Sequence, residues 1–593
     1  MTKSKILALL LVASTLIPSS LLFGQGQSVE GRRKALNAVL SDVWEDRLRT
    51  SPEFASSIGD SRYNDQLSDY SIKAYNENLA RGRAYLLRLS EIDTTGLTDQ
   101  EKLSSDLMVR DLVNEQDEAR FKPWQMPLNQ FSGLHTELPQ LVDQLSFKTV
   151  KDYDDWIARL HKMPAALQQI TDNMSLGMEE HRMPPKYLLE KVLVQVNTIA
   201  ALKPADSPFA RPIKKFPATI SAREQERISQ ETLDAVSHDV LPAYARLSRF
   251  LEHQYIPQGR TEPGVWSLPD GDTYYAFAVR RSTTTSLTPE QIHEIGLAEV
   301  KRDEEEMLAI AKKLGFNDLK SMQAAIARNP KLHPASKEAL LAAYQGHLDQ
   351  MKPRLPELFG RLPKAPLIVE ATPSYMEKDQ AAAYYLHGTA DGSRPGKVVV
   401  NTYNATSRSL ADVEAIAYHE GLPGHHLQIS IAQELQGLPE FRKHTYFTAY
   451  TEGWGLYAER LGKDVGFYQD PYSDYGRLET DIWRAIRLVV DTGVHSKHWT
   501  RDQMVDYFRQ HSAIDETNIQ AETDRYIAWP GQALGYKIGQ LKLLSLRAKA
   551  HEALGPKFDI RAFHDEVLDS GALPLDLLEA RVTAWIAQQK AAK

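Results

Sequence analysis

Apolar residues recur at helical spacing over most of the chain, and few segments alternate as strands do. In residues 289–314, for example, Ile292, Ile295, Val300 and Met307 recur among Glu and Lys, which is the pattern of an amphipathic helix with one buried face. The same pattern, broken by short Pro and Gly turns, predicts helices at 33–50, 72–92, 289–314 and 336–352. We therefore expect a mainly α protein, a large multi-helix fold.

The exception is the β-branched run at residues 396–403, which predicts a strand. It ends shortly before the histidine-rich motif described below, so we expect a small β element beside that motif. If one edge of the strand is open, its backbone N–H and C=O groups can pair with an extended peptide. The alternative is a short strand packed in a small sheet with no ligand role.

A stretch rich in Pro and Gly, residues 258–272, is the best candidate for a seam between two halves of the chain. It also contains Val265, Trp266 and Leu268, which indicate a packed connection and not a free linker. No internal repeat of fixed period is evident. We expect residues 27–593 to form a single unit, divisible into two helical lobes at this seam.

The composition indicates a globular protein and excludes several classes of function. Hydrophobic residues make up 42% and charged residues 25% of the chain, as in globular proteins with an ample core. The net charge is −8 and no basic run interleaved with aromatic residues occurs, so we expect no nucleic-acid partner. The chain contains no cysteine, which excludes disulfides, a cysteine nucleophile and a lipid-modified cysteine. The oligomeric state stays open.

The first residues resemble a secretory signal. Lys3 and Lys5 precede an apolar run at residues 6–17, and small residues follow. We expect a signal peptide at residues 1–26, with cleavage after Gly24 or Gly26. An uncleaved anchor is the alternative, but the apolar run is shorter than the roughly 20 residues that a membrane span needs. The expected location is periplasmic or secreted, with no stable membrane insertion after cleavage.

The chemically richest motif is His419-Glu420-Gly-Leu-Pro-Gly-His425-His426. It is similar to the zinc motif H-E-x-x-H, in which two histidines four apart bind one metal and the glutamate acts as general base. Histidines six apart on a regular helix point about 120° away from each other, and seven apart they are about 10 Å apart along the axis. Because Pro disfavours helix and Gly permits unusual backbone angles, we expect residues 421–424 to break the helix and bring the histidines together.

A metal at His419 needs further protein ligands. Only one of His425 and His426 can face the metal, since neighbours on a helix point about 100° apart. Periodicity leaves the choice open. A catalytic zinc usually has three protein ligands and one open position, and Glu452, in an apolar helical segment, is the candidate for the third. The alternative for Glu452 is a solvent-exposed helical glutamate.

Two elements of the chain resemble a known family. The H-E-G-x-P-G-H-H element at residues 419–426 and the T-E-G-W-x-L-Y-x-E element at residues 451–459 are similar to those of the bacterial DUF885 family, placed among gluzincin-type metallopeptidases and distantly similar to thimet oligopeptidase and angiotensin-converting enzyme. The resemblance implies a helical fold with a deep groove, zinc at its floor and peptide hydrolysis.

Carried over by position, the resemblance implies His419 and Glu452 as zinc ligands and Glu420 as general base. It favours His426 as the second ligand, because His426-Leu-Gln resembles the His-Ile-Gln that follows the motif in converting enzymes. His425 stays the alternative. Relatives often carry a carboxylate four residues after the glutamate ligand, where this chain has leucine, and Glu459 is the candidate to orient a histidine in its place.

Attack on a peptide carbonyl builds negative charge on oxygen, which a phenol or imidazole donor can stabilise. Tyr526 and Tyr536 lie on either side of a Pro-Gly turn, and related peptidases use a tyrosine from a comparable late segment. Tyr536 is preferred for its glycine neighbour, although either tyrosine can be a core residue. His495 is a second candidate donor, with a buried structural histidine as the alternative.

We therefore interpret the chain as an exported zinc metallopeptidase that acts on a peptide substrate, with Zn²⁺ as its cofactor and Glu420 as general base. Neither a G-x-S-x-G elbow nor a phosphate-binding loop occurs. Competing hypotheses are a helical periplasmic protein that binds peptides, or is catalytically silent, with a bound metal, and a zinc amidase acting on a non-peptide amide. Endo- or exopeptidase action and side-chain specificity stay open.

Overall fold

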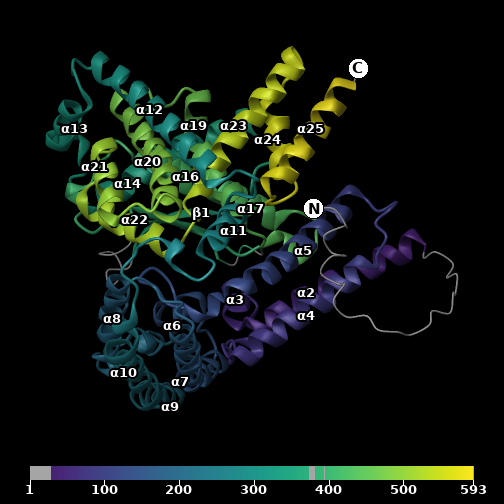
Figure 1. Ribbon diagram of the computed structural model, residues 1–593, viewed down its shortest axis with the longest axis vertical. Helices are drawn as coiled ribbons and strands as arrows, with labels where there is room; N and C mark the ends of the chain where they lie inside the picture. The colour runs from purple at the N-terminus through teal and green to yellow at the C-terminus, as the bar shows by residue number, and fades with distance from the viewer. Residues whose placement is uncertain (1–27, 373–380, 391, 393, 592–593) are drawn as a thin grey trace. The chain divides into compact units, whose positions relative to one another are not determined.

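The computed structural model describes residues 28–591 except 373–380, 391 and 393. It confirms a mainly α fold with one small sheet (Figure 1). The expected signal peptide, residues 1–26, lies outside the described residues. In the part of the chain that is described, no helix is both long and apolar enough to cross a membrane.

The chain divides into two compact units, each described here by itself. The first contains the residues up to Thr261 together with Leu438–Phe441, and the second contains Glu262–Gly437 and the residues from Arg442 onward. The helices of the first unit are α2 (Val29–Thr50), α3 (Pro52–Ser57), α4 (Ile72–Ser90), α5 (Asp99–Glu118), α6 (Leu134–Leu141), α7 (Val150–Glu179), α8 (Lys186–Ala200), α9 (Ala222–Ala235) and α10 (Leu241–Phe250).

The core of the first unit forms where α7, α8 and α10 pack together. Trp156 and Leu160 of α7, Leu189 and Val192 of α8, and Tyr244 of α10 are fully buried in one apolar cluster. Such burial of large side chains is the main source of stability in a helical fold.

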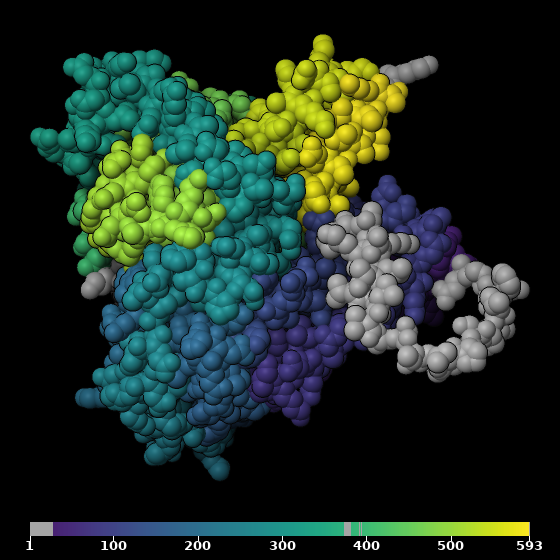
Figure 2. All heavy atoms as spheres, viewed as in Figure 1, coloured from purple at the N-terminus to yellow at the C-terminus, as the bar shows by residue number. Residues whose placement is uncertain are grey.

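The second unit carries the motifs singled out above. Its helices before the sheet are α11 (Gly271–Thr283), α12 (Pro289–Lys313), α13 (Leu319–Arg328), α14 (Lys337–Met351) and α15 (Leu355–Leu358). Those after the sheet are α16 (Val413–Glu420), α17 (His425–Glu434), α19 (Thr448–Asp464), α20 (Pro471–Ser496), α21 (Arg501–His511), α22 (Glu516–Ala528), α23 (Leu534–Leu554), α24 (Ile560–Leu568) and α25 (Leu575–Ala591), while α18 (Glu440–Lys443) includes residues of both units. Figure 2 shows α21 and α22, in yellow-green, at the surface of this unit.

Glycines allow the long helices of the second unit to pack closely. A Cβ atom on Gly296 of α12 would lie 2.7 Å from the Cβ of Leu488 on α20. At the crossing of α19 and α23, a Cβ atom on Gly539 would lie 1.8 Å from the carbonyl oxygen of Ala449. Any larger side chain would push these helices apart, so Gly296 sets how closely α12 packs on α20, and Gly539 sets how closely α23 packs on α19, the helix that carries Glu452.

The sheet has three strands in the order β1-β3-β2, with β1 (Leu367–Ala371) parallel and β2 (Ala383–Leu386) antiparallel to β3 (Gly396–Val400). The predicted strand at 396–403 is therefore β3, ending three residues earlier. The condition for peptide pairing, an open edge, is not met, because β3 is the central strand and hydrogen-bonds to a neighbour on each side. The alternative, a short strand packed in a small sheet, describes β3 correctly.

Candidate metal centre

The helix that begins at Val413 is interrupted between its two histidine positions, as predicted. It ends at Glu420 and resumes at His425, with the break at residues 421–424. Gly424 folds back against the first segment: a Cβ atom there would lie 2.0 Å from the carbonyl oxygen of His419. The indole N–H of Trp454 donates to the carbonyl oxygen of Pro423 at 3.0 Å and so holds the break against α19.

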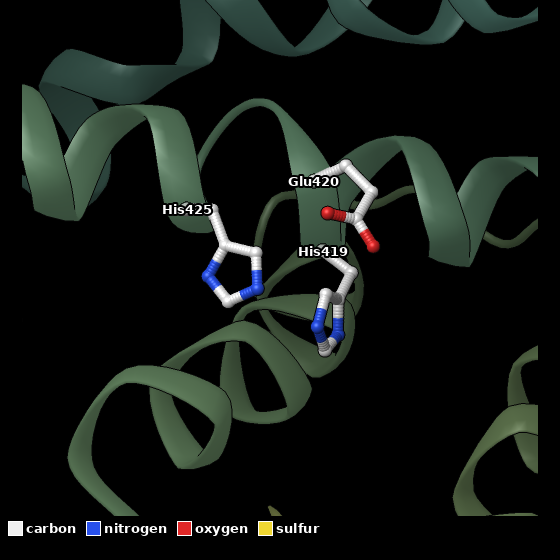
Figure 3. A group of neighbouring side chains, drawn as sticks. All are labelled: His419, Glu420 and His425. Atoms are coloured by element: carbon white, nitrogen blue, oxygen red, sulfur yellow. The ribbon is translucent and has the colours of Figure 1, made fainter. Parts of the chain in front are cut away.

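His419, His425 and Glu452 converge across this break. The Nε2 atom of His419 lies 3.5 Å and that of His425 lies 3.4 Å from Oε2 of Glu452. All three side chains are largely buried. Figure 3 shows His419 and His425 on the two sides of the break, with Glu420 beside them.

These separations match those of a metal site. A tetrahedral zinc with bonds of about 2.0–2.1 Å keeps its nitrogen and oxygen ligands about 3.4 Å apart. Two imidazole nitrogens and a carboxylate oxygen are also ligands that zinc prefers. The residues present therefore fit a zinc ion held by His419, His425 and Glu452.

A glycine on α19 makes room for the first histidine. A Cβ atom on Gly455 would lie 2.7 Å from Nε2 of His419, so a larger residue there would displace the imidazole ring. Gly455 stands three residues after Glu452, on the same side of the helix. On this face of α19, Glu452 thus provides a carboxylate, and Gly455 leaves the space in which the His419 ring approaches it.

Glu459 orients His419 from the other side of the ring. Its Oε1 atom accepts a hydrogen bond from Nδ1–H of His419 at 2.7 Å, and Thr480 donates to its other oxygen. Because Nδ1–H is committed to Glu459, Nε2 is the ring nitrogen left to bind a metal. Burial lowers the pKa of His419, but the hydrogen bonds that the ring donates to Glu452 and Glu459 outweigh burial and raise it to about 9. The site therefore stabilises positive charge.

We expect Glu459→Gln to weaken zinc binding about 10- to 100-fold, because glutamine holds the ring without the negative charge that makes Nε2 a stronger ligand. Zinc affinity is measured by competition with a chelator. Glu516→Gln, at an exposed position of α22, serves as the matched control and leaves the affinity unchanged. Equal affinities for both variants would contradict an orienting role for Glu459.

Glu420 lies beside His419 and His425, the two histidines that contact Glu452. The ligand atoms of His419, Glu420 and His425 all lie within 4.8 Å of one another. Burial raises the pKa of Glu420, and the neighbouring histidines lower it. By contrast, the two histidines hold the pKa of Glu452 well below its usual range against the opposing effect of burial. The pKa of Glu420 is thus raised and that of Glu452 lowered, so Glu420 is the carboxylate better suited to accept a proton.

His426, the preferred second ligand of the sequence prediction, points away from this cluster. Its Nδ1 accepts a hydrogen bond from the Tyr385 hydroxyl at 3.0 Å, and its Nε2 lies 3.1 Å from the carbonyl oxygen of Ala365. The ring also packs against Gly396, where a Cβ atom would lie 2.6 Å from Nδ1. His426 therefore joins α17 to the sheet, and His425 replaces it in the candidate ligand set.

The predicted transition-state donors lie in the second unit but are occupied by other contacts. The Tyr526 hydroxyl hydrogen-bonds to Nε of Arg487 at 2.8 Å and to Glu522. His495 is fully buried, accepts from the backbone N–H of Val265 at 3.1 Å and lies 3.0 Å from the carbonyl oxygen of Tyr526. These contacts give His495 the structural role that was its alternative and make Tyr526 an interior residue.

Tyr536 is half-buried, and its hydroxyl accepts a hydrogen bond from Arg525 at 3.3 Å. The structure adds a tyrosine that the sequence argument missed. The Tyr446 hydroxyl donates to Oε1 of Glu452 at 2.7 Å, while the residue as a whole is 54% exposed. Tyr446 stands six residues before Glu452, just before α19 begins, and this closeness in sequence was the one sign that it could reach the site. An exposed tyrosine in a loop belongs to no recognisable pattern, so the sequence did not single it out.

Comparison with known proteins places the chain in a family. A solved structure described as "the putative lipoprotein from Colwellia psychrerythraea" matches with a TM-score of 0.89 and 28% identity, over 94% of this chain and 99% of that one. A "putative lipoprotein of unknown function from Shewanella oneidensis" has the same fold, with a TM-score of 0.71 and 18% identity over 94% of this chain and 99% of that one. No curated protein matches the chain. A family model described as "Bacterial protein of unknown function (DUF885)" matches residues 52–582, so the chain belongs to the DUF885 family.

Proposed function

We propose that the protein is an exported, zinc-dependent peptidase in which Glu420 is the general base. The observation that carries this proposal is the convergence of His419, His425 and Glu452 at separations that fit tetrahedral zinc. Glu420 lies within 4.8 Å of both histidines, and we assign it to the water and not to the metal. Three protein ligands leave one coordination position open, which is typical of catalytic zinc, whereas structural zinc takes four.

Each residue of the cluster then has a separate task. His419, His425 and Glu452 would hold the zinc, and Glu459 would fix the ring of His419. When bound, zinc supplies Lewis-acid polarisation, the chemistry that makes water a nucleophile at neutral pH. Glu420, whose pKa is raised by burial, takes the proton from water and returns it to the departing amine.

The tyrosines near the cluster divide into two roles. Tyr446 donates to the oxygen of Glu452 that does not face the histidines, so we assign it to holding that carboxylate in place. Tyr536 is the candidate donor to the carbonyl oxygen of the substrate, where negative charge develops. Its partial exposure supports this assignment.

We propose a periplasmic or secreted location. The N-terminal sequence has the character of a secretory signal. The two structural relatives are described as putative lipoproteins, a class of proteins that are exported, and this description supports the same proposal.

Metal analysis and peptide digestion test the proposal together. We expect the purified protein to contain zinc, to cleave members of a mixed peptide library seen by mass spectrometry, to lose this activity with a chelator and to regain it with added zinc. A zinc-containing protein that binds but does not cut peptides would refute the peptidase and indicate a binding protein. Cleavage of other amides alone would indicate an amidase.

A further inference from the structure

A group of arginines in the second unit has no part in the mechanism above, and it surrounds Tyr536, the candidate donor to the substrate carbonyl. On α20, the ring of Trp483 has the guanidinium groups of Arg484 and Arg487 each 5.0 Å from its centre. Arg487 also stacks over the ring of Tyr536 at 4.4 Å, and Arg525 of α22 donates to the Tyr536 hydroxyl. We call Trp483, Arg487, Arg525 and Tyr536 the arginine cluster.

Both arginines of the arginine cluster contact Glu522. Nη2 of Arg487 lies 3.0 Å and Nη1 of Arg525 lies 3.3 Å from the same carboxylate, that of Glu522. Two guanidinium groups thus share one carboxylate. Arg487 is 3% exposed, and among the described residues its buried Nη1 has no hydrogen-bond partner. A buried charged donor without a partner is destabilising, and an incoming anion would satisfy it.

The arginine cluster interacts electrostatically with Tyr446, a residue that contacts the third candidate zinc ligand. The Tyr446 hydroxyl donates to Glu452. Burial and the negative charge of Glu452 raise the pKa of Tyr446, Tyr536 raises it further, and Arg525 lowers it. Tyr536 and Arg525 therefore lie within electrostatic reach of a hydroxyl that contacts the metal centre.

Arg484, next to Trp483 on α20, connects the arginine cluster to Glu459, the residue that orients His419. Arg484 stands one helical turn before Arg487 on α20. Its Nη2 lies 3.9 Å from Glu459, the residue that orients His419, and its charge opposes the effect of burial on the pKa of Glu420. The arginine cluster and the candidate metal centre are thus neighbouring parts of one site.

We propose that the arginine cluster binds a carboxylate of the peptide substrate, namely its C-terminal carboxylate, so that the protein removes short fragments from the C-terminus. This inference rests on the proposed peptidase function. A guanidinium group presents parallel N–H donors that match the two oxygens of a carboxylate. Arg487 stands one helical turn after Arg484, whose Nη2 lies 3.9 Å from Glu459, so a peptide anchored by Arg487 and Arg525 places a bond near its C-terminus at the metal.

Binding of short peptides to zinc-loaded Glu420→Gln protein tests the inference without relying on catalysis. Three peptides of one parent sequence are compared by calorimetry: the free acid, its C-terminal amide, and the amide with one neutral residue replaced by aspartate. We expect the free acid to bind about 10- to 100-fold more tightly than either amide. Equal affinities for acid and amide would overturn the inference, and tight binding of the aspartyl amide would overturn the C-terminal assignment.

Substitutions in the arginine cluster test whether it causes the difference in affinity between acid and amide. Arg525→Gln should lower the affinity for the free acid to that of the amide and leave the affinity for the amide unchanged. Arg487→Gln should do the same, with thermal unfolding as a check because Arg487 is buried. Arg509→Gln, an exposed arginine of α21 paired with Glu516, is the matched control and changes neither affinity. Equal loss of acid and amide binding in Arg525→Gln would overturn the inference.

The two proposals fail in different measurements. If the peptidase proposal is wrong, the parent protein shows no zinc-dependent hydrolysis, whatever the acid and amide affinities are. If the arginine cluster does not bind the C-terminus, hydrolysis proceeds but acid and amide bind and react alike.

Discussion

Glu420→Gln will keep zinc and lower kcat/KM for peptide hydrolysis about 100- to 10,000-fold. Glutamine has nearly the size of glutamate but cannot accept a proton from water. Glu420 is not among the residues whose atoms contact Oε2 of Glu452, so its replacement leaves His419, His425 and Glu452 in place. Zinc content is measured by elemental analysis and hydrolysis with a peptide that the parent protein cleaves.

Glu414→Gln is a matched control for this variant, because Glu414 lies on the same helix and bonds to Tyr418 and Ser473 instead of facing the histidines. It should cleave peptides at the parent rate. A Glu420→Gln protein that hydrolyses peptides as fast as the parent would show that Glu420 is not the general base, even if zinc is present.

His425→Ala will lose stoichiometric zinc, whereas His426→Ala will retain it. His425 Nε2 faces Glu452, but both nitrogens of His426 contact groups of the sheet region. Loss of a direct ligand should weaken zinc binding beyond the about 10- to 100-fold expected when only an orienting partner is lost. Zinc affinity is measured by competition with a chelator in both variants, and Glu452→Ala should behave as His425→Ala does.

Thermal unfolding with a chelator present measures how much each substitution destabilises the fold, separately from its effect on zinc binding. His426→Ala removes two buried hydrogen bonds and should unfold at a lower temperature, while still binding zinc. The opposite pattern, with zinc lost from His426→Ala and kept by His425→Ala, would return His426 to the ligand set.

Helices with local start signals were predictable. The expected helix at 289–314 is α12, where Pro289 follows a Thr288 cap that bonds to the backbone N–H of Gln291. These signals lie within one turn of each other, so the sequence displays them directly. The partners of β3 were not predictable, because strand pairing depends on segments distant in sequence. Of the two possibilities for this strand, an open edge or a place within a small sheet, the structure has the second.

The residues of the candidate site were predictable in type but not in arrangement. His419, Glu420, Glu452 and Glu459 stand out as a pattern because each lies in a helical segment rich in apolar residues. Tyr446 does not, since a loop tyrosine has no periodic context. The arginine cluster draws its members from α20, α22 and α23, and only their packing brings those side chains together.

By itself, the sequence determined that the chain is helical, that the helix breaks between His419 and His425, and that two histidines and several glutamates accompany the break. These features depend on residue types a few positions apart. The tertiary structure decided which histidine faces Glu452, which carboxylate holds the ring of His419, and which tyrosines and arginines adjoin them. Each residue turns a helix by about 100°, so the exit angle of the Gly421–Gly424 break and the packing of α19 and α20 against α16 choose the side chains that meet.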